Sequence, residues 1–167
     1  MIKTFNSLLV TMFGLGKVKF MPGTFGSLTT IIFLFYLFHV LNIPSNIILI
    51  GWIIIFIYSF YAVSTHTESS KNKDPGEIII DEFLGQSIPI YLYEISHGTT
   101  KGSDEAIIYY ALFFILFRYF DIMKPFPVNF FDKNFKNSFG VIMDDICAGL
   151  YVVLTVVCFM VIKSYVL

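Results

Sequence analysis

Four apolar runs divide this sequence, and each is close to the length that a membrane-spanning helix needs. A helix of roughly 20 apolar residues crosses the hydrocarbon core of a bilayer, which is about 30 Å thick. The runs cover residues 25–40, 46–63, 106–120 and 146–167. With 20 Phe in 167 residues and a mean hydropathy of +0.76, the chain carries more apolar surface than a soluble core absorbs. We therefore predict an all-α integral membrane protein, a single domain over residues 1–167 with about four to five membrane-embedded helices.

A fifth apolar segment, residues 83–95, decides the topology. It contains Pro89, and its 13 residues cover only about 20 Å at a rise of 1.5 Å per residue, so it must tilt, thin the bilayer or re-enter. If this segment crosses or deeply re-enters the membrane, Asp81, Asp121 and Asp144 emerge on the same side as the N-terminus. Of the 11 Lys and Arg residues, all but Lys101 and Lys163 would then share that side. The positive-inside rule makes it the cytoplasmic side.

The connections between the runs are short or polar. Runs 25–40 and 46–63 are so close that a helical hairpin is predicted between them. Polar loops are predicted at residues 64–80, where Asp74-Pro75-Gly76 signals a turn, and at residues 96–105.

Acidic residues stand out because so little of the chain is charged. Asp81 and Glu82 are adjacent, Asp144 and Asp145 are adjacent, and Asp121 lies between the two pairs. Adjacent carboxylates repel each other and resist burial, so two pairs beside apolar runs require a compensating cation. Oxygen ligands without a His or Cys cluster suit Mg²⁺, or Mn²⁺ in its place, better than zinc or copper. The alternative for any one pair is a solvated helix start.

Two cations flank Asp121 at a distance of three residues each. Arg118 shares a helix face with Asp121, and Lys124 precedes Pro125, where the helix must stop. A lone cation at the end of a span is usually an anchor at the membrane surface. Cations interleaved with acids also suit phosphate, which needs positive donors around its oxygens.

The segment MPGTFGS, residues 21–27, leads into the first apolar run. Pro22 and Gly23 predict a turn, and Thr24 or Ser27 is predicted to cap the helix that follows. Free backbone N–H groups at such a helix start suit an anion, although a plain helix cap is the alternative.

Four motifs in order resemble the phosphatidylglycerophosphatase A family: MPGTFGS (21–27), DPGEIIIDEFLG (74–85), RYFDIMKPFPV (118–128) and GVIMDDICAG (140–149). The resemblance implies a Mg²⁺-dependent enzyme of the bacterial inner membrane. Its substrate would be the phospholipid phosphatidylglycerol phosphate, which it would hydrolyse to phosphatidylglycerol and inorganic phosphate. One departure is Asn137-Ser138-Phe139, where the family is richer in glycine.

The candidate site residues follow from these patterns. The candidate catalytic and metal-binding residues are Asp81, Glu82, Asp121, Asp144 and Asp145. The candidate substrate-binding residues are Thr24, Ser27, Arg118 and Lys124. Such a site would hold Mg²⁺, polarise a phosphoryl oxygen and activate a water molecule, while the cations neutralise the phosphate. Which acid is a ligand and which a general base stays open.

Other functions fit the sequence less well. The cysteine-phosphatase spacing and the DxDx[TV] pattern of aspartyl-phosphate enzymes are both missing from the sequence. A phospholipid head-group transferase would carry a DG-x₂-AR acid pattern, which is also missing. A small metal or ion transporter would place acids inside its spans, whereas the acidic pairs lie at predicted span ends. A net charge of −1 gives no basic face for nucleic acid.

Overall fold

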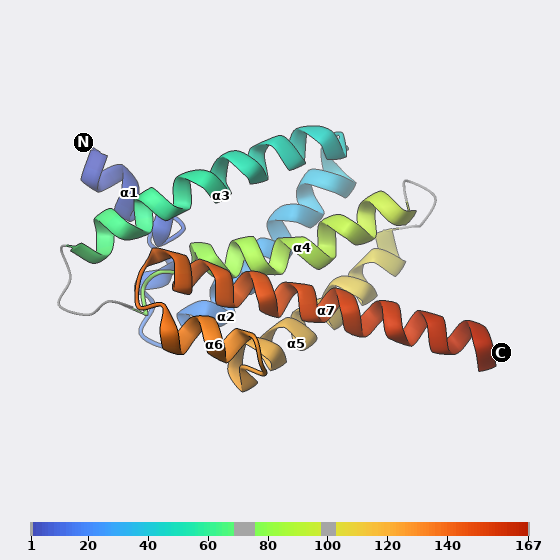
Figure 1. The fold of residues 1–167 in the computed structure, drawn as a ribbon. Coiled ribbons are helices and arrows are strands. Elements are labelled where there is room, and N and C mark those ends of the chain that lie inside the picture. Colours follow the sequence, from blue (N-terminus) through green and yellow to red (C-terminus); the bar gives the residue numbers. More distant parts are fainter. Residues whose placement is uncertain (1, 69–75, 98–102, 167) are drawn as a thin grey trace.

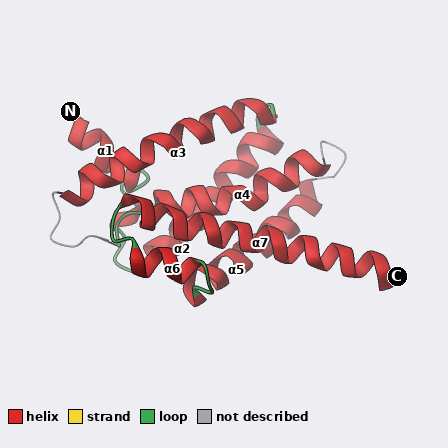
Figure 2. Cartoon of the chain, viewed as in Figure 1, coloured by secondary structure: helices red, strands yellow, loops and turns green. Residues whose placement is uncertain are grey.

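The protein is a bundle of helices (Figures 1 and 2). The computed structural model describes residues 2–68, 76–97 and 103–166, and these contain helices and no strand, which confirms the all-α prediction. In chain order the elements are α1 (Ile2–Val10), the 3-10 turn η1 (Leu15–Lys17), α2 (Pro22–Phe35), the π-helical stretch η2 (Tyr36–Val40), α3 (Ser45–Glu68), α4 (Ile80–His97), α5 (Ser103–Met123), α6 (Val128–Asn134) and α7 (Ser138–Val166).

Four segments are long and apolar enough to cross a membrane. They are Pro22–Val40, Ser45–Glu68, Asp104–Met123 and Ser138–Tyr165. Each corresponds to one of the four apolar runs of the sequence. These four helices confirm the expectation of a helical membrane protein.

Helix α4 is the core of the bundle. It packs most extensively against α7 and also contacts α2, α3 and α5. Leu84 and Ile90 are fully buried on it, and Phe83 and Tyr93 nearly so. Its 18 residues extend for about 27 Å. The fifth segment is thus longer than the apolar stretch predicted it to be, because the helix continues through polar residues at both ends.

Two glycines let α4 and α7 approach closely. A Cβ atom on Gly149 would lie 2.3 Å from the carbonyl oxygen of Gly85, and a Cβ atom on Gly85 would lie 2.4 Å from the carbonyl oxygen of Asp145. Pro89 lacks an N–H, so the Gly85 carbonyl receives no hydrogen bond from the residue four positions later. This crossing brings the first turns of α4 beside the Asp144-Asp145 pair of α7.

The N-terminal segment braces the start of α4. Helix α1 packs against α3, where the Tyr58 hydroxyl donates a hydrogen bond of 2.7 Å to Asn6 Oδ1. The backbone N–H of Ile79 donates to the carbonyl of Val10 at 2.9 Å. These contacts hold the residues immediately before Asp81 and Glu82.

Two helix starts differ from the prediction. Helix α7 begins at Ser138 instead of residue 146, because Asn137 Oδ1 accepts the N–H of Gly140 at 3.1 Å and caps the helix. The acidic pair therefore lies in the second turn of α7. The prediction that Thr24 or Ser27 caps α2 is wrong: α2 starts at Pro22, after Met21, with no side-chain cap.

The loops also differ in part. Helix α3 continues to Glu68, into the predicted polar loop. Helix α2 with its continuation η2 lies on one side of the turn at residues 41–44, and α3 lies on the other. The two helices diverge from this turn, and α4 packs against both of them (Figure 1). The predicted turn at Asp74-Pro75, and the cations Lys71, Lys73 and Lys101, lie outside the described residues.

The glycine crossing predicts a difference between two Gly→Ala substitutions. Gly149→Ala should destabilise the protein by about 1–3 kcal/mol, because the added methyl group meets backbone and forces the helices apart. Gly51→Ala on α3 is the matched control, since a Cβ atom there meets nothing within 4 Å and helix propensity favours Ala by about 1 kcal/mol. Thermal unfolding in detergent measures both. Equal unfolding midpoints for the two variants would contradict a tight crossing.

Candidate active site

A cavity of about 430 Å³ opens where the first turns of α2, α4 and α7 meet the end of α5 and the helix α6. It is lined by all five predicted acids and by three of the four predicted substrate-binding residues: Asp81, Glu82, Asp121, Asp144, Asp145, Thr24, Arg118 and Lys124. Ser27 does not line the cavity. Its hydroxyl is fully buried and donates to the carbonyl of Gly23 at 3.0 Å, within α2.

Three of the acids form a group that could hold a metal ion. One carboxylate oxygen from each of Asp81, Glu82 and Asp145 lies within 4.8 Å of the others. The first two come from the first turn of α4 and the third from α7, so the glycine crossing brings them together. Asp145 is almost completely buried. Glu82 Oε2 is also buried, and no group of the described residues donates a hydrogen bond to it.

Crowding and burial oppose ionisation of this group. Burial, then repulsion by Glu82 and Asp145, raises the pKa of Asp81 well above its ordinary value. Burial raises the pKa of Glu82 to about 7, although its hydrogen bond with Asp81 opposes the shift. Protons therefore occupy part of the group near neutral pH unless a cation replaces them.

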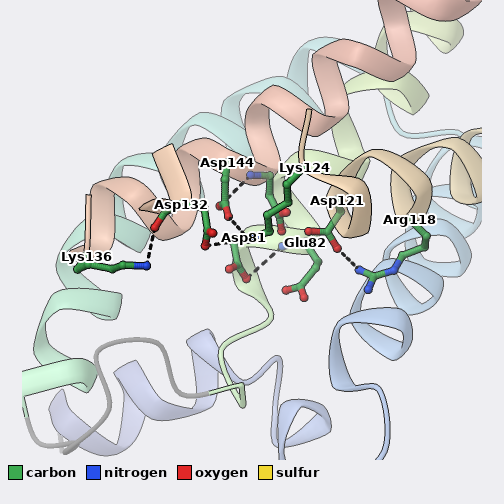
Figure 3. Close-up of polar contacts among 9 residues, drawn as sticks. Asp81, Glu82, Arg118, Asp121, Lys124, Asp132, Lys136 and Asp144 are labelled. Carbon is green, nitrogen blue, oxygen red and sulfur yellow. Dashed lines mark hydrogen bonds and ion pairs between the residues drawn. The ribbon is translucent and has the colours of Figure 1, made fainter. Parts of the chain in front are cut away.

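The two acids of the pair Asp144-Asp145 have different neighbours: Asp144 contacts Lys124, and Asp145 lies with Asp81 and Glu82. Lys124 Nζ lies 3.0 Å from Asp144 Oδ2 and 2.9 Å from Asp132 Oδ1 (Figure 3). Burial alone would lower the pKa of Lys124, but the hydrogen bonds and attraction of Asp132 and Asp144 outweigh it, and the pKa rises. The hydrogen bond from Lys124 in turn lowers the pKa of Asp132. Lys124 thus stays charged and holds Asp144, while Asp145 joins the other acids.

Arg118 lies beyond Glu82 and Asp121, on the side away from Asp132 (Figure 3). Its Nη1 is 2.7 Å from Asp121 Oδ2, which confirms the predicted shared helix face. Its Nε is buried and donates to no acceptor among the described residues.

The start of α2 closes this side of the cavity. A Cβ atom on Gly23 would lie 2.1 Å from Glu82 Oε1 and 3.2 Å from Arg118 Nη1, so a larger residue there would displace the Glu82 side chain. The hydroxyl of Thr24 is buried and, within the described chain, has no hydrogen-bond partner. Among the described residues, the Thr24 hydroxyl and Arg118 Nε therefore lack an acceptor and Glu82 Oε2 lacks a donor, and all three residues line the same cavity.

Two charged residues of the cavity were not predicted. Asp132 and Lys136 line it from α6 and the turn after it, and the Lys136 ammonium donates to the Asp132 carbonyl at 2.7 Å. A four-residue spacing would place both on one face of a continuous helix, although α6 ends before Lys136. That spacing was the available signal, but α6 is a seven-residue helix hidden between two apolar runs.

The chain matches a known protein family over most of its length. The family model "Phosphatidylglycerophosphatase A" matches residues 8–160. The chain belongs to the phosphatidylglycerophosphatase A family. This membership confirms the resemblance seen in the four motifs and shows that the protein is a phosphoric monoester hydrolase.

Three relatives cover most of the chain. "Phosphatidylglycerophosphatase A" of Haemophilus influenzae is 36% identical over 89% of this chain and 85% of its own length. "Putative phosphatidylinositol-3-phosphatase" of Bacteroides thetaiotaomicron is 33% identical over 86% of each chain. "Phosphatidylglycerophosphatase A" of Escherichia coli is 31% identical over 86% of this chain and 76% of its own. No solved structure matches this phosphatidylglycerophosphatase A family member.

The raised pKa of Glu82 predicts how the metal-free protein responds to pH. The pKa of about 7 in the folded state exceeds the ordinary 4.5, so the unfolded state loses its proton first, and stability falls as pH rises between these values. In EDTA, the thermal unfolding midpoint should drop by a few degrees from pH 5 to pH 8. A drop of this size corresponds to a loss of about 1–2 kcal/mol in the free energy of unfolding. Glu82→Gln should flatten this dependence. A midpoint that rises with pH equally in both proteins would contradict it.

Proposed function

We propose that this protein is a Mg²⁺-dependent phosphatase that hydrolyses phosphatidylglycerol phosphate to phosphatidylglycerol and inorganic phosphate. It would act at the cytoplasmic face of a bacterial inner membrane. The observation that carries the proposal is the complementary set of unpaired groups in one cavity. Thr24 and Arg118 offer donors to phosphate oxygens, and Glu82, beside Asp81 and Asp145, offers oxygens to a metal ion.

The depth of the cavity suits a lipid headgroup. From residue 146 to residue 166, α7 carries one charged side chain, Lys163 near its end, and measures about 31 Å, close to the thickness of the hydrocarbon core. The acidic pair precedes this stretch directly, so the cavity would lie at the level of the lipid phosphates. The first turns of three helices also face the cavity, and their N-terminal dipoles favour an anion.

The residues present fit Mg²⁺. Asp81, Glu82 and Asp145 supply hard oxygen ligands close to one another, and the orphaned, buried Glu82 Oε2 needs a cation. When bound, Mg²⁺ would neutralise charge on the phosphoryl oxygens and lower the pKa of a water molecule.

The remaining side chains then have distinct tasks. Arg118, with its planar fork, and the Thr24 hydroxyl would orient the phosphate. Asp144, which accepts a hydrogen bond from Lys124, would accept a proton from the attacking water. The water oxygen forms the new bond to phosphorus, the bond from phosphorus to the headgroup oxygen breaks, and that oxygen takes up a proton to give the alcohol.

The other candidate functions lose support. Family membership favours hydrolysis over head-group transfer. The five acids line one cavity, whereas a transporter would need acids along its spans. The relative named for phosphatidylinositol 3-phosphate supports a second substrate, since both lipids carry a phosphate monoester on a headgroup joined through a phosphate diester.

Phosphate release from the purified protein in detergent should require added Mg²⁺ and stop in EDTA. Asp145→Asn should lower kcat by at least about 100-fold, because the amide keeps the shape but loses the charge that holds the metal. Asp104→Asn, on an exposed acid at the start of α5, is the control and should change little. The assay compares phosphatidylglycerol phosphate, phosphatidylinositol 3-phosphate and phosphatidic acid. Release from none of them, or full activity in EDTA, would overturn the proposal.

Arg118→Lys separates a phosphate clamp from a membrane anchor. An anchor needs only a positive charge on a flexible stem, so the change would then be silent. A clamp that uses the fork of Arg should lose at least about tenfold in kcat/KM, with normal membrane insertion. Poor insertion with normal specific activity would favour the anchor.

A further inference from the structure

The connection between α5 and α7 has two chemically different sides. Asp132 and Lys136 line the cavity on one side. On the other, Phe126 is 71% exposed and Phe130 is 44% exposed. None of these residues belongs to the segments that are long and apolar enough to cross a membrane.

A line of aromatic rings joins the exposed side to the cavity. The ring centroids of Phe126 and Phe130 are 6.2 Å apart, and those of Phe130 and Phe135 are 6.0 Å apart. Phe135 itself lines the cavity. We call Phe126, Phe130 and Phe135 the aromatic ridge. It is a continuous apolar path from the protein surface to the phosphate-binding residues.

The segment that carries the aromatic ridge is attached to α7. Val128 is fully buried, and the hydroxyl of Tyr151 on α7 donates to the carbonyl of Phe126. Lys124 joins the start of the connection to Asp144 of α7. These contacts attach the backbone that carries the exposed rings to α7.

The aromatic ridge lies beside the end of α7 that precedes its apolar stretch, so in a bilayer it would lie where lipid headgroups meet acyl chains. Helix α6 packs alongside the first turns of α7, which precede its apolar stretch (Figure 1). Exposed rings next to cations such as Lys133 are typical of the membrane interface, where aromatic side chains enter the lipid and cations stay at the headgroups.

We propose that the aromatic ridge is the docking surface for the acyl-chain end of the phospholipid substrate, whose headgroup passes Phe135 into the cavity. This inference rests on the proposed function. A phospholipid is the occupant that matches both sides of the connection, because its chains are apolar and its phosphates complement Lys124 and Lys136 at the cavity.

A kinetic comparison tests the docking surface. The double variant Phe126→Ala/Phe130→Ala is assayed on phosphatidylglycerol phosphate in mixed micelles and on its water-soluble, deacylated analogue. The loss in kcat/KM should be at least tenfold greater for the lipid. Phe159→Ala, on a residue 66% exposed toward the far end of α7, is the matched control and should not discriminate between the substrates. Equal losses on both substrates, or no loss on the lipid, would overturn the inference.

A spectroscopic measurement decides the location independently of activity. Phe130→Trp in a Trp52→Phe background provides a single tryptophan, since the chain has one Trp. In phosphatidylcholine vesicles, lipids brominated near the headgroup end of the chain should quench it strongly. Absence of quenching would place the ridge in water or against protein and overturn the inference. If the wild-type protein releases no phosphate from any lipid, the proposed function fails, whereas the quenching result still stands on its own.

Discussion

The contact between Gly85 and Gly149 is the constraint on which the site depends. Helices α4 and α7 carry the metal-binding candidates, and a side chain at either glycine would meet backbone at less than 2.5 Å. Any wider crossing would move Asp145 away from Asp81 and Glu82. The cavity also needs Gly23, because a Cβ atom there would occupy the space of the Glu82 carboxylate. The three glycines therefore leave the space in which the acidic side chains of α4 and α7 lie close together.

Charge is distributed unequally among the clustered acids. Asp121 pairs with Arg118, and Asp144 pairs with Lys124. Asp81, Glu82 and Asp145 are left with one another, and burial raises the pKa of the first two. The protein thus pairs two carboxylates with its own cations and leaves three to protons or to a metal. This division places Asp144 and Asp145, which are neighbours in the sequence, in different surroundings.

The sequence predicted the membrane-spanning helices and the acidic site because both depend on strong local signals. Long apolar runs have few alternatives, and carboxylate pairs are conspicuous in a chain with so little charge. It did not predict the hydrogen bond of Ser27 within α2, the cap that Asn137 provides for α7, or the ion pair between Asp132 and Lys124. These outcomes depend on where helices begin and on contacts between segments, and neither periodicity nor hydropathy determines them. The length of α4 was missed for the same reason, since the polar residues at its ends carry no hydropathy signal.

The position of the cavity at the end of the apolar part of α7 separates the fates of the two proposed products. Phosphatidylglycerol keeps its acyl chains and would leave sideways into the leaflet, whereas inorganic phosphate would leave into the water. The two products would then accumulate in different phases. Feedback by the lipid would follow its mole fraction in the leaflet, and feedback by phosphate its concentration in solution. One active site would in this way respond separately to the composition of the membrane and to that of the surrounding aqueous phase.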